Sequence, residues 1–134
     1  DLGPVEVLVY NAGTGDFINI DKTTVKGLQQ AWEVNTRGLF VTTQQVLLDM
    51  RKAGGGNIVV SGATASLRGG ANAAPFASAK AAQRSLAQSM ARGLGSAGVH
   101  VSYVVIDEIP ATDWGYGGLS QDARKSGAGG KAVP

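Results

Sequence analysis

Three short runs of apolar, mostly β-branched residues divide the chain. They cover residues 5–10, 57–61 and 99–106. Continuous apolar runs of this length are typical of strands in a parallel sheet whose two faces are both covered. We therefore predict three strands. The first run is apolar on both faces and does not suit the edge of a sheet, so we expect it to need a neighbouring strand that this chain does not supply.

The two segments between these runs have the spacing of amphipathic helices. From Val25 to about Arg51, one row of side chains recurs at alternating spacings of four and three residues, and Thr24 is the predicted N-cap. The second helix is predicted to begin at Pro75, because the fixed φ of proline suits a first helical turn. The first row is Leu28, Trp32, Asn35, Leu39, Thr42, Val46 and Met50, and the second is Phe76, Ala79, Gln83, Leu86, Met90 and Leu94.

Strands that alternate with long helices predict an α/β fold with parallel strands. Ligands of such sheets bind beyond the carboxyl ends of the strands, so the loop over residues 61–74 is the predicted location of any chemistry. Glycine clusters at residues 54–56 and 93–98 end the two helices. From residue 107 onward the periodicity is lost, which predicts an irregular tail.

The composition excludes several functional classes. The net charge is +2, and no Lys/Arg cluster interleaves with aromatic residues, which argues against a nucleic-acid interface. The chain has no cysteine and one histidine, which excludes disulfides and a multi-histidine metal site. No apolar run approaches the roughly 20 residues of a membrane span, and no signal peptide is recognisable. We expect no metal site, no membrane partner and a cytoplasmic location.

The order of three polar features suggests a family. Asn11-Ala12-Gly13 follows the first strand, Asn35 lies inside the first helix, and Lys80 lies in the second helix. In this order they resemble the short-chain dehydrogenase/reductase family over residues 1–112, with an irregular Gly-rich tail at 113–134. The resemblance implies a partial Rossmann-like domain: a three-layer α/β arrangement with about three parallel strands and two long helices.

The family's first strand and glycine-rich turn, which hold the cofactor pyrophosphate, have no counterpart in this sequence. The chain also begins at Asp1 rather than Met and enters a strand within a few residues. If the chain belongs to an enzyme of this family, we expect an upstream half that carries the glycine motif.

The resemblance also implies a cofactor, NAD or NADP, and a small-molecule carbonyl or alcohol substrate. Asn11, Ala12 and Gly13 would lie beside the adenosine half of the cofactor, and Thr112 would touch its carboxamide. Lys80 would bind the nicotinamide ribose and lower the pKa of a catalytic tyrosine.

Two of these features have ordinary structural alternatives. The Asn-Ala-Gly turn is also a common way to end a strand. Asn35 would hold a water of the proton relay in the family, but a helical Asn is also found exposed or capping a kink. Its row places Asn35 between Trp32 and Leu39, where an unpartnered amide costs about 1–3 kcal/mol, so we expect it to have hydrogen-bond partners.

Two catalytic hydroxyls of the family are missing. Phe76 stands four residues before Lys80, where the family has Tyr, and Ala63 stands where it has Ser. Phe76 has no proton to donate, so the usual acid step of carbonyl reduction is not available to it, and it suits a packing role. Ser61 lies about 7 Å from the Ser position, and Ser78 lies on another face of its helix.

Asp107 follows the third strand and is a third candidate catalytic residue beside Asn35 and Lys80. A carboxylate there would act as acid or base if burial raised its pKa. The alternative is an ordinary solvated turn residue.

Three functional hypotheses follow. The chain is part of an NAD(P)-dependent oxidoreductase, or a non-enzymatic module whose two long helices pair with a partner or a second copy, or a fragment without independent function. Small side chains on the second helix allow a close helix contact, so we expect a homo-oligomer through the two long helices.

Overall fold

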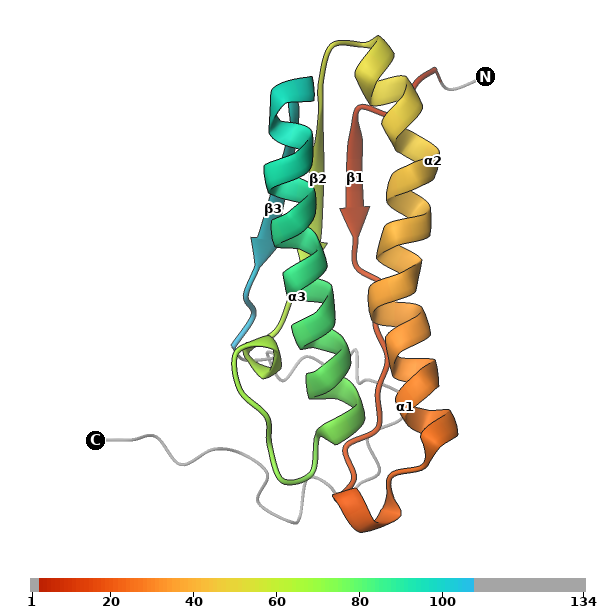
Figure 1. Ribbon diagram of the computed structural model, residues 1–134, viewed down its shortest axis with the longest axis vertical. Coiled ribbons are helices and arrows are strands. Elements are labelled where there is room, and N and C mark those ends of the chain that lie inside the picture. Colours follow the sequence, from red (N-terminus) through yellow and green to blue (C-terminus); the bar gives the residue numbers. More distant parts are fainter. Residues whose placement is uncertain (1–2, 108–134) are drawn as a thin grey trace, which may run out of the picture.

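Three parallel strands form the sheet of this computed structural model, which describes residues 3–107 (Figure 1). The strands lie in the order β1-β2-β3, with β1 and β3 both paired to β2. The elements are β1 (Val7–Tyr10), η1 (Ile20–Lys22), α1 (Val25–Trp32), η2 (Glu33–Arg37), α2 (Gly38–Lys52), β2 (Gly56–Ser61), η3 (Thr64–Ser66), α3 (Ala74–Leu94), η4 (Gly95–Ala97) and β3 (Val99–Val104).

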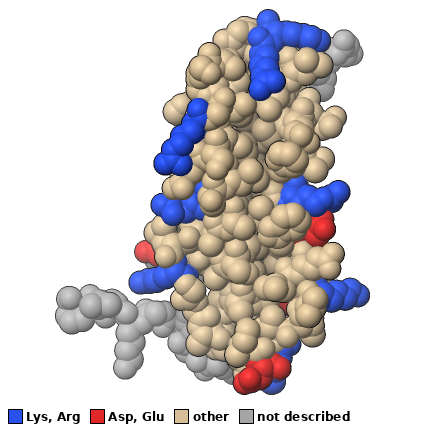
Figure 2. Space-filling model, viewed as in Figure 1, with Lys and Arg blue, Asp and Glu red and all other residues tan. Residues whose placement is uncertain are grey.

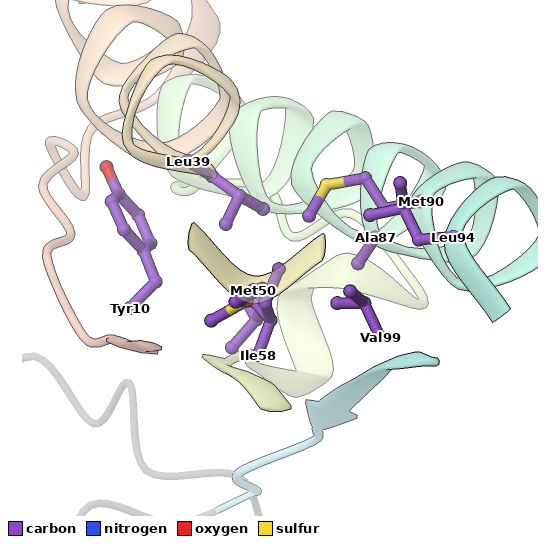
Figure 3. Close-up of a cluster of buried hydrophobic side chains, with 9 residues drawn as sticks. Tyr10, Leu39, Met50, Ile58, Ala87, Met90, Leu94 and Val99 are labelled. Atoms are coloured by element: carbon purple, nitrogen blue, oxygen red, sulfur yellow. The ribbon is translucent and has the colours of Figure 1, made fainter. Parts of the chain in front are cut away.

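The predicted α/β class, with three parallel strands and two long helices, is confirmed. The long helical segments lie on one side of the strands (Figure 3), so the described residues supply two layers, one of helices and one of sheet. The predicted irregular tail at 113–134 lies outside the described residues. Within residues 3–107, no helix is long and apolar enough to cross a membrane.

The two faces of the sheet differ because of this one-sided cover. Leu8 and Ile58 are paired across the strands on the helix-facing side, where Ile58 is fully buried. Val7 and Val9 point to the other side and are 54% and 62% exposed. Within the described residues β1 is therefore an edge strand with an open apolar face, which agrees with the expectation that this chain does not supply the neighbour that the strand needs. Two strands are shorter than predicted, since β1 begins at Val7 and β3 ends at Val104, while β2 begins one residue earlier, at Gly56.

The first long helix runs from Val25 to Lys52, as predicted, with Thr24 as its N-cap accepting a hydrogen bond from the Gly27 N–H at 3.0 Å. Its middle, η2, is a π-helical turn. A π turn widens the helix and releases backbone carbonyls from the regular ladder. It also shifts the helix faces, and the first part of the predicted row is not buried: Leu28 is 43% and Trp32 is 45% exposed.

The second long helix, α3, confirms the prediction of a helix opened by proline, since Pro75 lies in its first turn. Its row is correct at Ala79, Gln83, Met90 and Leu94, all of which are buried. Gly98 ends the following turn with φ of +74°, a conformation that favours glycine.

The hydrophobic core lies between the helices and the sheet. Figure 3 shows side chains from α2, α3 and all three strands meeting there. The buried members are Tyr10, Leu39, Met50, Ile58, Val60, Ala87, Met90, Leu94 and Val99.

Candidate active site

Lys80 is the central charged group of the site. Its side chain leaves α3 toward the carboxyl end of β2, where its Nζ donates to the Ser61 carbonyl at 2.9 Å. The residue is only 6% exposed, and burial lowers the pKa of Lys80 from 10.5 to about 8. A buried ammonium group must have its donors satisfied, and here a strand-end carbonyl takes one of them.

Gln83 satisfies a second donor of that ammonium group. Its Oε1 accepts from Lys80 Nζ at 3.1 Å, and its Nε2 donates to the Asn35 carbonyl at 2.7 Å. The side chain is fully buried. The sequence pattern identified Gln83 only as a packing position, although a Gln in a buried helical row is itself a signal that partners must exist.

Asn35 lies in the π turn of η2 and is fully buried. Its Nδ2 donates to the Thr14 carbonyl and, at 2.8 Å, to the Ala31 carbonyl. The expectation that Asn35 has hydrogen-bond partners is confirmed. Its Oδ1, in contrast, has no hydrogen-bond partner among the described residues. The site therefore contains one buried acceptor that is available to a further group.

The loop after β1 covers Lys80 and Asn35. An added Cβ at Gly13 would lie 3.1 Å from Asn35 Oδ1 and 3.5 Å from Lys80 Nζ. The turn thus brings its backbone against both functional groups, while Asn11 and Ala12 are exposed. An added Cβ at Gly15 would lie 2.8 Å from the Phe76 Cβ. Glycine is required for this close approach, which the sequence pattern did not reveal.

Phe76 lies one helical turn before Lys80 and packs in an aromatic pair with Phe17. The two ring centroids are 5.1 Å apart, and Lys80 Nζ lies 5.8 Å from the Phe76 centroid. This arrangement agrees with a packing role and adds a weak cation–π contact. The ring offers no proton at the place where it meets Lys80.

The remaining candidates lie around this cluster. Ser61 contributes its backbone carbonyl, and the Ser78 hydroxyl donates back to the Ala74 carbonyl of its own helix at 2.7 Å. Asp107 is exposed just beyond β3. Ala63 is half-buried at the start of the loop after β2. Thr112 lies outside the described residues.

The fold and the cluster at the strand ends agree with the family comparisons. The sequence pattern of the short chain dehydrogenase family matches residues 1–114. The chain therefore belongs to the short-chain dehydrogenase family.

The similar proteins include dehydrogenases and one relative whose name describes it as inactive. An inactive 2-(S)-hydroxypropyl-CoM dehydrogenase 2 of Xanthobacter autotrophicus is 34% identical over 122 residues, which are 91% of this chain and 53% of that protein. A short-chain dehydrogenase from Rhodopseudomonas palustris superposes with a TM-score of 0.74 at 40% identity, over 80% of this chain and 50% of that chain.

A gluconate 5-dehydrogenase from Burkholderia cenocepacia, solved with NADP and tartrate, gives a TM-score of 0.75 at 25% identity over 79% of this chain and 42% of that chain. The chain thus spans about half the length of the relatives it matches.

Proposed function

We propose that this chain forms the nicotinamide-ribose side of an NAD(P) site in an oxidoreductase of the short-chain dehydrogenase type. The observation that carries the proposal is the position of Lys80, whose buried ammonium group is held at the carboxyl end of β2 beside Gly13. Ligands of parallel α/β sheets bind at this edge. Because Gly13 has no side chain, only its backbone lies beside the ammonium group.

The residues present fit a ribose. Lys80 has three N–H donors, and two are used by Ser61 and Gln83. The third donor suits a sugar hydroxyl, and the unpartnered Asn35 Oδ1 suits an ordered water or hydroxyl near it. Asn11, Ala12 and Gly13 would then border the cofactor. When bound, NAD or NADP supplies or takes up a hydride, and this chain's groups bind and orient it.

Proton transfer is the step that this chain does not supply in the usual way. Phe76 and Ala63 occupy the positions where the family has its catalytic Tyr and Ser hydroxyls. We therefore propose a cofactor-binding site with little or no turnover of a carbonyl or alcohol substrate. The related Xanthobacter dehydrogenase, whose name describes it as inactive, supports this reading.

Asp107 remains a proposed acid or base. Its exposed position after β3 leaves it accessible to a substrate. Asp107→Asn tests the role: unchanged turnover in any active form of the protein removes it. We also propose that Thr112 contacts the carboxamide of the cofactor and that the Rossmann-like domain ends at residue 112. We further propose a cytoplasmic location.

The test of cofactor binding is a titration of the chain with NADH and NADPH, followed by nucleotide fluorescence. We expect Lys80→Met to weaken binding by about tenfold or more, because it removes a charge-assisted donor. Lys52→Met, at the exposed end of α2, is the matched control and should bind like the wild type. Absence of binding by the wild-type chain would overturn the proposal.

The same reasoning predicts a gain of function. Phe76→Tyr combined with Ala63→Ser restores both hydroxyls next to Lys80. We expect this double variant to reduce a small carbonyl compound with NADH or NADPH measurably faster than the wild type. Each single variant serves as a control, since each restores only one of the two hydroxyls.

A second candidate function is self-association through the long helices. Figure 2 shows that the centre of the helix-covered side carries few charges, with Lys and Arg mainly at its margin. A groove of about 400 Å³ between α1 and α3 is almost entirely apolar. The exposed large apolar residues of the first long helix are Val25, Leu28, Trp32, Phe40, Val41 and Leu48.

Such exposed apolar area marks an interaction surface. We expect a dimer in analytical ultracentrifugation that Trp32→Lys dissociates, while Gln88→Lys on the outside of α3 leaves it intact. A monomer at the highest soluble concentration would contradict this candidate function.

A further inference from the structure

The side chain of Gln83 connects the two long helices through the functional groups of the site. Its amide carbonyl accepts from Lys80 Nζ at 3.1 Å, and its amide nitrogen donates to the backbone carbonyl of Asn35 at 2.7 Å. The direction of the amide is fixed by these partners. The ammonium group only donates and the backbone carbonyl only accepts, so only one orientation of the amide satisfies both.

The bridge meets the first long helix at the π turn. Asn35 lies in η2, and its backbone carbonyl accepts from Gln83 on α3. Thr36 adds a second link, since its Oγ1 donates to the Ala79 carbonyl at 2.9 Å. The two helices are therefore held in a fixed register beside Lys80.

Two acceptors fix the direction of the ammonium group. Lys80 Nζ is bound by Ser61 on the strand side and by Gln83 on the helix side. A tetrahedral ammonium group with two N–H bonds fixed has its third N–H direction determined. Gly13 lies beside the ammonium group, since an added Cβ at this residue would be 3.5 Å from Nζ.

An amide differs from water or a carboxyl group in one chemical respect. It donates and accepts hydrogen bonds, but it does not take up or release a proton near neutral pH. A bridge made by Gln83 therefore holds Lys80 without passing protons between Lys80 and the interior of the first long helix. This property suits a group that binds a ligand and does not suit a proton path.

We propose that Gln83 is a positioning residue that fixes Lys80 as a hydrogen-bond donor to the ribose of a bound dinucleotide and closes the proton path between Lys80 and Asn35. The inference rests on the proposed cofactor site, but the positioning of Lys80 by Gln83 concerns only this chain's own residues. It assigns a specific role to a buried side chain that would otherwise count as packing.

The first experiment follows the Lys80 side chain by NMR in the 134-residue chain labelled with carbon-13 lysine. Gln83→Leu removes an acceptor from the ammonium group and should lower the midpoint of the Lys80 titration below the wild-type value. Gln83→Glu adds a negative charge there and should raise it. Gln88→Leu, exposed on the same helix, is the matched control and should leave it unchanged. A purely structural Gln83 would leave the midpoint unchanged in Gln83→Leu.

The second experiment measures NADH and NADPH affinity in the same variants. We expect Gln83→Leu to weaken binding about tenfold. Gln83→Glu keeps an acceptor for Lys80 and should restore most of the lost affinity. Equal affinity in wild type and Gln83→Leu would overturn the ribose half of the proposal.

The two readouts separate the possible failures. If the wild-type chain binds neither dinucleotide, the proposed function and the ribose half fall together, while the Lys80 titration still decides whether Gln83 positions Lys80. If Gln83→Leu does not fold by circular dichroism, Gln83→Glu carries the titration test alone. An unchanged midpoint in Gln83→Glu overturns the positioning role.

Discussion

The two ends of the helix pair are both buried, but they are held together by different forces. Toward the amino ends of the strands, Met50, Val99 and Leu94 pack as an apolar core. Toward the carboxyl ends, Asn35 and Gln83 occupy the same helical rows, and Lys80 is bound to Gln83. The first end depends on excluded water and close packing, and the second on donors and acceptors placed in pairs. The comparison teaches that one helical period serves both a core and a site.

The apolar end should be the more sensitive to loss of volume. Leu39 is completely buried in the core, so Leu39→Ala should lower the free energy of unfolding by about 3 kcal/mol through lost burial and a cavity. Leu48→Ala, at a side chain that is 61% exposed, should change it by less than about 0.5 kcal/mol. Urea denaturation measures both, and equal effects would show that the packing at Leu39 is not as described.

The polar end should be sensitive to loss of a partner rather than of volume. Asn35→Ala removes both donors that hold the Thr14 and Ala31 carbonyls, and we expect a loss of about 2 kcal/mol in the same assay. Asn57→Ala, at an exposed position in β2, is the control. A loss no greater than that of the control would mean that the loop after β1 is not held by Asn35.

Two threonines of the same helical segment sharpen the comparison. Thr36 Oγ1 donates to the Ala79 carbonyl, whereas Thr43 Oγ1 is buried without a hydrogen-bond partner among the described residues. Thr36→Val should cost about 1 kcal/mol, while Thr43→Val should be neutral or stabilising, because valine places no unpaired hydroxyl in the core. The same sign for both substitutions would contradict these assignments.

A further prediction is a dependence of stability on pH. Burial lowers the pKa of folded Lys80 to about 8, against 10.5 when unfolded. Below pH 8 both states hold the proton and the contribution is constant. Above it the unfolded state binds more protons, so the free energy of unfolding should rise with pH.

Tyr10 opposes this rise at higher pH, because burial raises its pKa above 10.0. The measurement therefore compares wild type with Lys80→Met between pH 8 and 10. We expect a steeper slope in the wild type. Parallel curves would show that the ammonium group of Lys80 is not buried in solution.

Much of the fold follows from the sequence pattern. The periodicity of apolar residues predicts both long helices, and Pro75 and Thr24 predict their starts within a residue. The family resemblance, based on the order of Asn35, Lys80 and the turn after β1, is confirmed by the family comparison. These features depend on local geometry, which a sequence expresses directly.

The parts that the sequence did not predict depend on contacts between distant segments. The π turn leaves the helix continuous, so the spacing of apolar residues does not reveal it and wrongly places Trp32 in the buried row. The bridge by Gln83 joins residues 48 positions apart. The packing of Gly15 on Phe76 joins the loop after β1 to the distant helix α3. The roles of Lys80 and Asn35 in binding or catalysis remain predictions.

The open face of the sheet has a practical consequence for handling this chain in solution. Among residues 3–107, exposed valines lie on β1, whose outer edge has no paired strand, and such an edge allows strands of other chains to add to the sheet. A rise in apparent mass is therefore not sufficient proof of helix pairing. Val9→Thr should raise the solubility limit of the chain without changing a dimer that forms through its helices, and light scattering at matched concentrations separates these two kinds of assembly.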